Sequence, residues 1–340
     1  MTTHFYVVAG ESLVHLQKSE GNWSITVVHV GRRFLCLAAD EKHLGRFYAG
    51  TFDDGLWKSD DFGRTWDPVG AGITSQRIPS VAVSPTEKYG DYSVVWAGTE
   101  PSGLFRSEDG GDTWTDSPTL LDIPSEPTWS FPPRPYTHHT KYIQPDIHEA
   151  ERIFVGIELG GVMRSNDGGK TWDDRKPNSQ YDCHSLTMHH KAPGRVYEAA
   201  GGGYAETRDG GETWQTINDG LAPYTYLVHI AVDSGDPDTM IASAAKGART
   251  AYRKETAETV IVRRTGDGPW QIVNKGLPNA KGSIVYELFA HPEKPSVFYA
   301  VNNTGIYEST DAGVTWKHLP VKWPESLREE RIRGFVYLKS

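Results

Sequence analysis

The sequence has little cysteine, little methionine and no excess of positive charge. Only Cys36 and Cys183 occur among 340 residues, too few for a disulfide framework or a structural zinc site, and we interpret both as buried apolar side chains. Lys and Arg number 35 against 44 Asp and Glu, a net charge of -9. This acidic balance argues against nucleic acid and an anionic membrane as partners.

Long apolar runs are missing as well. No window reaches the length of a membrane-spanning helix, and the first ten residues, Met-Thr-Thr-His-Phe-Tyr-Val-Val-Ala-Gly, carry no basic segment ahead of an apolar core. We therefore expect a soluble cytoplasmic protein with no membrane partner.

One short motif recurs along almost the whole chain. The pattern Ser/Thr-x-Asp-x-Gly-x-Thr-Trp occupies residues 59–66, 107–114, 165–172, 207–214 and 309–316, and degenerate copies lie at 19–23 and 265–270. The Asp side chain suits hydrogen bonds to the amides of its own turn, and the Gly accepts a positive φ. Thr-Trp then begins a strand with residues that favour a half-buried sheet. The motif predicts a repeated hairpin.

This motif resembles the Asp-box, or BNR, repeat of sialidases, xyloglucanases, sortilin-type receptors and many bacterial propellers. Flanking segments such as Gly-Leu-Trp-Lys-Ser and Gly-Leu-Phe-Arg-Ser strengthen the resemblance, because they read as the strand before the turn. The resemblance implies a β-propeller, and it implies little about chemistry.

The spacing of the repeats predicts the number of blades. Successive copies of the closing tryptophan lie 42 to 58 residues apart, at Trp23, Trp66, Trp114, Trp172, Trp214, Trp270 and Trp316. Each interval suits a four-stranded blade, and the two ends of the chain together supply one more interval. We predict one domain over residues 1–340, an all-β seven-bladed propeller of antiparallel blades. The N-terminal blade lacks a strand that residues 334–338 would supply, closing the ring.

Alternate turns of a four-stranded meander lie on opposite faces. The Asp boxes are third turns, so the second turns and the links between blades share the other face. The two longest insertions fall there, a proline-rich link around residues 118–135 and a long turn at 246–258. Long loops in a compact fold are usually functional, so we predict the site on this face, at the mouth of the central channel.

Aligning the innermost strands places two levels of side chains at that mouth. The first level is Arg33, Arg77, His139, Asp182, Tyr226 and Ile284, and the second is Leu35, Pro79, Lys141, His184, Val228 and Tyr286. Second turns add Glu100 and Glu158, and the proline-rich link adds Trp129, Arg134 and His138. Aromatic platforms beside charged groups are typical of sites for sugars and other polar ligands.

In an enzyme, His139 or His184 would be the general acid or base, with Glu100 or Glu158 as partner. The arginines would stabilise negative charge that develops during a reaction. The predicted substrate-binding residues are Arg33, Arg77, Arg134, His138, Lys141, Asp182, Tyr226, Tyr286 and Trp129. A divalent metal bound by His138, His139 or His184 is a further hypothesis, since imidazole and carboxylate suit Zn, Mn or Fe. No His-Glu-x-x-His spacing supports it.

Gln76-Arg77-Ile78-Pro79 is similar to the Arg-Ile-Pro motif of sialidases, which would make Arg77 a carboxylate ligand. Here the motif follows an Asp box instead of preceding the first one, and no motif supplies the other sialidase arginines. We expect a hydrolase or a lyase, glycosidase-like, acting on a small anionic or sugar-like ligand. The alternatives are a noncatalytic propeller that binds a protein, similar to photosynthetic assembly factors or sortilin-type peptide binders, and a solvated channel mouth with internal ion pairs.

Overall fold

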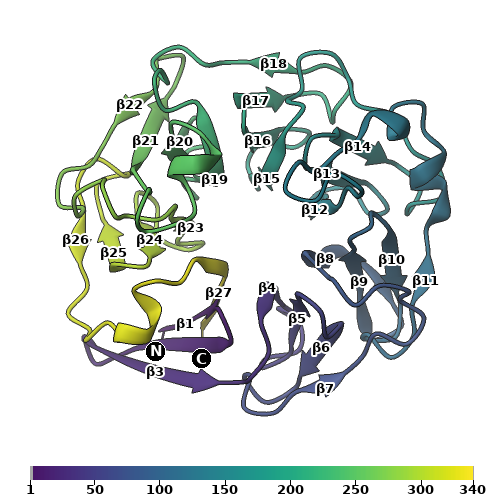
Figure 1. Cartoon of the computed structure of the whole chain (residues 1–340), viewed down its shortest axis with the longest axis horizontal. Coiled ribbons are helices and arrows are strands. Elements are labelled where there is room, and N and C mark those ends of the chain that lie inside the picture. Colours follow the sequence, from purple (N-terminus) through teal and green to yellow (C-terminus); the bar gives the residue numbers. More distant parts are fainter. Residues whose placement is uncertain (1–2, 340) are drawn as a thin grey trace. The chain divides into compact units, whose positions relative to one another are not determined.

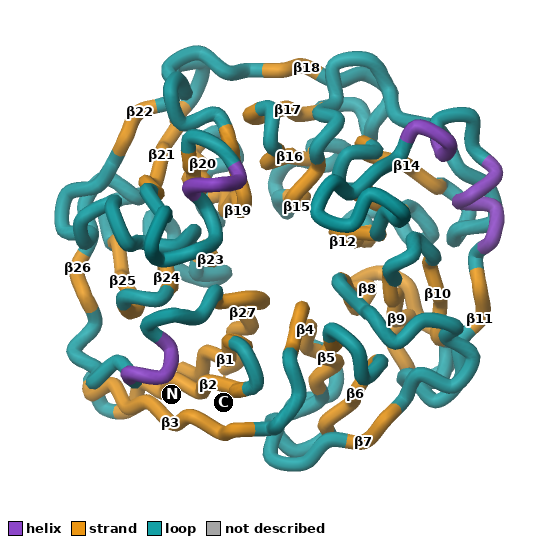
Figure 2. The backbone as a smooth tube through the Cα atoms, viewed as in Figure 1, coloured by secondary structure: helices purple, strands orange, loops and turns teal. Residues whose placement is uncertain are grey.

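A computed structural model describes residues 3–339 of the chain. Within these residues the secondary structure is β strand apart from four short 3-10 helices, and seven antiparallel sheets form the blades of a β-propeller (Figures 1 and 2). The predicted fold class is confirmed. The described chain forms two compact units. The first combines the segment up to Arg175 with the segment from Arg333 onward, and the second runs from Lys176 to Ile332.

The first unit contains four sheets. The N-terminal sheet runs in the order β27 (Ile332–Lys339), β1 (Thr3–Ala9), β2 (Ser12–Ser19) and β3 (Asn22–His29). The next two sheets are β4 (Phe34–Ala39), β5 (Phe47–Thr51), β6 (Leu56–Ser59) and β7 (Asp67–Pro68), then β8 (Ser80–Tyr89), β9 (Tyr92–Gly98), β10 (Leu104–Ser107) and β11 (Thr115–Asp116). The 3-10 helices η1 (Pro118–Asp122) and η2 (Glu126–Thr128) precede the last sheet, β12 (Thr140–Pro145), β13 (Ile153–Ile157) and β14 (Gly161–Ser165).

The second unit contains the other three sheets. They are β15 (Cys183–Met188), β16 (Val196–Ala200), β17 (Gly203–Thr207) and β18 (Gln215–Thr216); β19 (Tyr226–Val232), β20 (Thr239–Ala245), β21 (Thr259–Thr265) and β22 (Gln271–Ile272); and β23 (Glu287–Ala290), β24 (Phe298–Asn302), β25 (Gly305–Ser309) and β26 (Lys317–His318). The helix η3 (Ala248–Thr250) lies in the long turn after β20, and η4 (Glu325–Leu327) lies between β26 and β27.

The C-terminal strand completes the N-terminal sheet, as the sequence predicts. β27 lies beside β1 (Figure 1). The rings of Phe335 and Tyr337 lie 5.2 and 5.6 Å from that of Phe5, and Val336 and Leu338 join a buried cluster of the same unit. The exchange pairs an edge of β1 that would otherwise be open.

The third turns are closed by their own side chains. In the second full Asp box, Asp109 accepts hydrogen bonds from the Thr113 amide at 2.9 Å and from its hydroxyl at 2.5 Å. Ser107 donates to the same carboxylate and accepts from the Gly111 amide, where φ is +94°. The same bonds recur around Asp61, Asp167, Asp209 and Asp311. The motif is therefore a self-satisfied turn.

One blade departs from the four-stranded plan. Beyond β14 the fourth strand is reduced to a single bridge between Arg164 and Asp173. The chain then leaves the sheet, because Asp174 accepts a hydrogen bond from the Ser125 amide and Arg175 donates to the Thr128 hydroxyl at 3.2 Å. These contacts tie the sheet to the proline-rich link instead of extending it.

A β-bulge recurs in the first strand of four blades. The register shifts between the residues on either side of Leu35, Lys141, His184 and Val228. These four residues are equivalent positions in the sequence alignment, at its second level. A bulge turns a side chain away from the regular alternation, and bulges often lie beside functional sites.

Among the described residues, no helix is long and apolar enough to cross a membrane.

Candidate functional site

A residue shortly before the first strand and a residue shortly after the second strand form a recurring pair. The Phe52 amide donates to the Arg33 carbonyl at 2.9 Å, and the Glu100 amide donates to the Arg77 carbonyl at 3.1 Å. In the second unit the Gly201 amide bonds the Asp182 carbonyl at 2.9 Å. Because this backbone junction repeats, these three blades present equivalent residues at the same end of their strands.

Glu100 is held by two arginines of the first unit. Arg134, on the proline-rich link, donates from Nε and Nη2 to the two carboxylate oxygens, and Arg77 donates from Nη1 at 3.1 Å. Only 2% of the Glu100 side chain is exposed. Burial alone would raise the pKa of Glu100, but the hydrogen bond and charge of Arg134, with the charges of His139 and Arg77, lower it below its ordinary value. Glu100 therefore remains ionised at neutral pH.

Three guanidinium groups surround the ring of Phe52. The guanidinium carbon lies 4.2 Å from the ring centre for Arg77, 5.3 Å for Arg33 and 5.9 Å for Arg134. Arg77 also donates from Nε to the Phe52 carbonyl at 3.1 Å. Arg33 is exposed and makes no ion pair with any residue between 3 and 339. Phe52 thus organises positive charge through cation–π contacts, and sequence reasoning missed it.

His139 lies between the two predicted carboxylates. Its Nδ1 is 3.8 Å from Glu100 Oε2 and its Nε2 is 3.1 Å from Glu158 Oε2, while Lys141 Nζ is 3.2 Å from the same Glu158 oxygen. The ring of Phe131 meets that of His139 edge-on at 4.4 Å. The structure therefore brings together Arg33, Arg77, Arg134, Glu100, His139, Glu158 and Lys141 with Phe52, and we name this set the arginine–glutamate cluster.

Trp129 and His138 lie apart from these contacts. The indole of Trp129 is buried in a core cluster and donates to Ser125 Oγ at 3.1 Å. The His138 ring meets it edge-on at 5.3 Å, and His138 Nε2 lies 3.3 Å from Glu126. Burial lowers the pKa of His138, although the charge of Glu126 opposes the shift. Both side chains pack the proline-rich link instead of presenting a platform to solvent.

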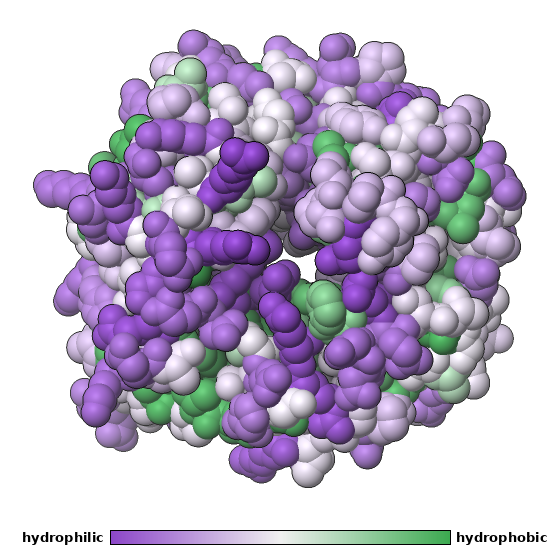
Figure 3. Space-filling model, viewed as in Figure 1, coloured by the Kyte–Doolittle hydropathy of each residue, from purple (hydrophilic) through white to green (hydrophobic). Residues whose placement is uncertain are grey.

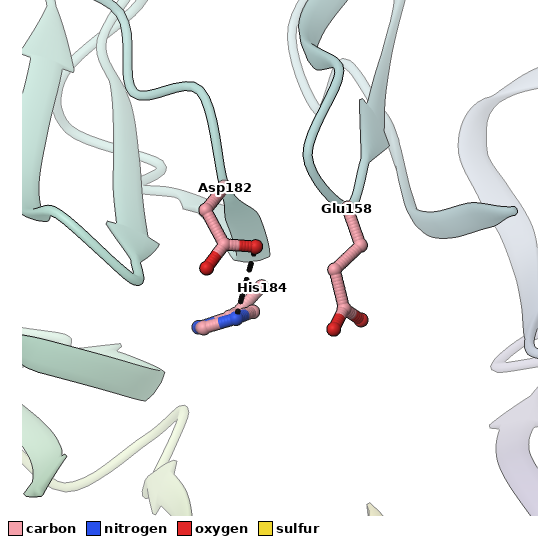
Figure 4. A group of neighbouring side chains, drawn as sticks. All are labelled: Glu158, Asp182 and His184. Carbon is pink, nitrogen blue, oxygen red and sulfur yellow. Dashed lines mark ion pairs between the residues drawn. The ribbon is translucent and has the colours of Figure 1, made fainter. Parts of the chain in front are cut away.

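In the second unit, Asp182, His184 and Tyr226 form a separate group. His184 Nε2 lies 3.5 Å from Asp182 Oδ1, and its Nδ1 lies 2.5 Å from the Leu227 carbonyl (Figure 4, which also draws Glu158 of the first unit). The His184 ring packs against Tyr226 at 4.7 Å, and the Tyr226 hydroxyl is 3.1 Å from that of Tyr252. Because His184 Nδ1 faces the Leu227 carbonyl oxygen, Nδ1 carries a proton and donates to it. The other ring nitrogen, Nε2, faces the Asp182 carboxylate.

Two further buried groups of this unit were not predicted. Glu198, on β16, is fully buried with one oxygen bonded by the Gln180 amide at 3.0 Å, and desolvation raises the pKa of Glu198 to about 8. His229 Nε2 lies 3.1 Å from Glu287 Oε2, and His229 Nδ1 accepts from the Leu288 amide. Neither has a motif around it that would reveal it from the sequence. Tyr286, a predicted ligand contact, is 1% exposed and packs in a core cluster.

The predicted metal ligands do not gather within one unit. Among residues 3–339, neither unit taken by itself brings together the ligand atoms of three or more His, Cys, Asp or Glu side chains. His138 faces Glu126, whereas His139 faces Glu100 and Glu158. The metal hypothesis therefore gains no ligand set inside either unit.

The surface seen in Figure 3 is mostly hydrophilic, with hydrophobic residues in small scattered groups. A broad apolar patch across several blades, which a protein-binding face would favour, is not apparent in this view.

Comparisons with known proteins support the fold. No protein-family model and no curated protein matches the sequence. Among solved structures, the Niastella koreensis GH74 enzyme is 16% identical with a TM-score of 0.66, covering 92% of this chain and 53% of its own. An ancestral GH74 enzyme is 17% identical with a TM-score of 0.64, covering 90% and 38%. YCF48 bound to the D1 peptide is 17% identical with a TM-score of 0.56, covering 84% and 82%.

The chain therefore spans about half, or less, of these GH74 enzymes and most of YCF48. Identities this low establish a shared propeller fold and carry no activity to this chain.

Proposed function

We propose that the arginine–glutamate cluster binds a small anionic, sugar-like ligand, and that His139 with Glu158 transfers a proton to or from it. The observation that carries the proposal is a charge imbalance among residues 3–339: Arg77 and Arg134, both partly buried, share the carboxylate of Glu100, and Arg33 has no ion pair. Buried or half-buried positive charge without a matching anion is costly, and an anionic ligand would remove that cost.

The unused donors define where an anion would bind. Arg77 donates from Nε to the Phe52 carbonyl and from Nη1 to Glu100, and Arg134 donates from Nε and Nη2 to Glu100. A guanidinium has five N–H groups, so both arginines keep donors for a second acceptor. The Arg33 side chain donates no hydrogen bond to any residue in the described range. The planar, bidentate geometry of these groups suits a carboxylate, sulfate or phosphate.

The state of the carboxylates favours a lyase over a two-carboxylate hydrolase. Because Arg77 and Arg134 hold Glu100 ionised, Glu100 is a poor general acid and acts instead as the anchor of the arginines. Glu158, 14% exposed and bonded to His139, remains for proton transfer. In a β-elimination the base removes the proton from the carbon next to the substrate carboxylate, and the C–H electrons form a C=C bond to the β carbon. The C–O bond at the β carbon breaks, and the departing oxygen takes up a proton from His139 or from water. Arginines would stabilise the anion that develops on the carboxylate.

The test uses oligosaccharides of uronic acids, with neutral oligosaccharides as the substrate control. A lyase produces a conjugated C=C bond that absorbs in the ultraviolet, and a hydrolase produces only new reducing ends. We expect the ultraviolet product with acidic substrates, its loss in His139→Asn, and its retention in His138→Asn. Turnover that survives in His139→Asn would contradict the assigned proton-transfer pair.

A noncatalytic, protein-binding function is the second candidate, favoured by the coverage of YCF48 over most of its length. If this is the function, we expect wild-type protein to bind no acidic saccharide. Substitutions in the arginine–glutamate cluster should instead change its affinity for an acidic peptide.

A further inference from the structure

A pocket in the second unit lies outside the groups described above. It has a volume of about 450 Å³, and its lining residues are Thr304, His318, Val321, Lys322, Trp323, Pro324, Glu325 and Arg328. They come from the β24–β25 turn, from β26, and from the link that contains η4. This volume falls within the range of pockets that hold small organic ligands.

The apolar wall of the pocket is fixed in place. Trp323 is 6% exposed and donates from Nε1 to the Asn303 carbonyl at 3.1 Å, while Val321 is 8% exposed. Asn303 donates in turn to the carbonyls of Gly282 and Arg328. Because the Trp323 indole is held by a buried hydrogen bond and Val321 by burial, the wall needs no rearrangement to receive a flat ligand.

The opposite wall is polar and equally well supported. The Thr304 hydroxyl donates to Asn302 and lies 3.0 Å from the Tyr307 hydroxyl, and the Tyr307 ring meets that of His318 edge-on at 5.1 Å. The His318 imidazole lies directly against Gly305, where φ is +147° and a Cβ would collide with it. A side chain at residue 305 would therefore displace His318 from the pocket.

The rim carries an excess of positive charge. Arg328 pairs with Glu325 at 2.7 Å, which leaves the Lys322 ammonium without an ion pair to any residue in the described range 3–339. An exposed pair such as Arg328–Glu325 contributes little to folding, so the link is not held in place by it. The rim is thus one positive charge in excess, beside an indole and a proline ring.

We propose that this pocket is a second ligand site, which takes a small organic anion with a flat apolar body, such as an aromatic carboxylate. The apolar body packs on Trp323 and Pro324, and the carboxylate pairs with Lys322 at the rim. The site is independent of the arginine–glutamate cluster, because no residue is shared between them.

The experiment is titration of the full chain with benzoate and indole-3-acetate, followed by calorimetry and by the indole N–H signals in NMR spectra. Benzamide and indole-3-acetamide are matched probes without the charge. We expect saturable binding of the acids in the range below about 10 mM, binding of the amides weaker by about tenfold, and a shifted Trp323 signal. Lys322→Ala should weaken the acids by about tenfold, the usual scale of one charge-assisted contact.

Lys317→Ala is the control. Lys317 is exposed on β26 beside His318 and does not line the pocket, so its substitution removes the same charge outside the site. It should leave affinity within about twofold. Equal binding of acids and amides, equal loss in the two lysine variants, or no saturable binding by any probe would overturn the proposal. Failure of the proposed lyase would leave these results unchanged.

Discussion

The Asp-box turns and the second turns of the blades both connect neighbouring strands, but their polar side chains find partners in different places. Each Asp box satisfies its polar groups internally, through an Asp, a Ser or Thr and a backbone amide in nearly identical geometry. The second turns instead carry Phe52, Glu100 and Glu158, whose side chains contact charged side chains of other segments. Repetition marks the turns that build the fold, and variation at equivalent positions marks those available for chemistry.

The largest expected effect lies on the repeated side. Trp114 is buried in a core cluster and donates from Nε1 to the Gly111 carbonyl at 3.0 Å. Trp114→Ala should lower the free energy of unfolding by about 3–5 kcal/mol, measured by denaturant titration. The half-exposed Trp23 in β3 is the control and should cost less. Equal losses would show that burial in the core does not distinguish the two tryptophans.

Glu100 offers a test on the variable side. Glu100→Gln leaves Arg77 and Arg134 facing a neutral amide, so we expect a loss of about 1–3 kcal/mol in the free energy of unfolding. Glu149→Gln, at an exposed side chain, is the control and should change little. Because the pKa of Glu100 is lowered on folding, its stabilisation is present above the ordinary carboxyl pKa and disappears as the pH falls through the folded value. A variant as stable as wild type at pH 7 would contradict the anchoring role.

The Asp boxes predict a loss of stability in acid. Burial acts to raise the pKa of Asp61 and Asp167, but several hydrogen bonds, from Thr65 or Thr171 and from the box serine, together lower it to about 2. The stabilisation from the two ionised carboxylates is complete above the unfolded pKa near 3.8 and is lost as the pH falls towards 2. At pH 7, Asp167→Ala should cost about 1 kcal/mol in thermal or denaturant unfolding. The exposed Asp53→Ala should cost nothing, and a pH-independent difference between the variants would contradict this account.

The smallest expected effect on stability is at Arg33. Arg33→Ala should change the free energy of unfolding by less than about 0.5 kcal/mol, because the side chain is exposed and has no ion pair among the described residues. It should nevertheless weaken binding of an acidic saccharide by about tenfold. Arg32→Ala is the matched control, since Arg32 pairs with Asp54 and stacks on Trp57. Equal affinity losses in both variants would point to a general charge effect instead of a site.

Much of the fold was predictable because its signals are local. The Asp, Gly, Thr and Trp of each box act within one turn, and the bulges at Lys141 and His184 fall where aligned strands placed equivalent residues. The reduced fourth strand after β14 was not predictable. It depends on contacts of Asp174 and Arg175 with distant segments, and no local pattern encodes them.

The site was predictable in part for the same reason. The alignment placed Arg77 and His139 at one level of the channel mouth and Glu100 and Glu158 on second turns of the same face, without pairing them. In the structure Arg77 pairs with Glu100, and His139 lies between Glu100 and Glu158. Phe52 could not be predicted because its role depends on cation–π contacts with arginines of three separate segments, and no local pattern marks it. The bond from Arg134 to Glu100 depends on the path of the proline-rich link, which Leu120, Ile123 and Trp129 fix by burial in the core. That the cluster acts on a ligand stays a prediction.

The most direct test is a crystal structure of the protein soaked with an acidic monosaccharide such as glucuronate. We expect its carboxylate within hydrogen-bond distance of Arg33 and of the unused donors of Arg77 or Arg134, with Glu100 still bound to both arginines. A saccharide bound elsewhere, with Arg33 in contact with solvent alone, would contradict the claim that the arginine–glutamate cluster is the ligand site.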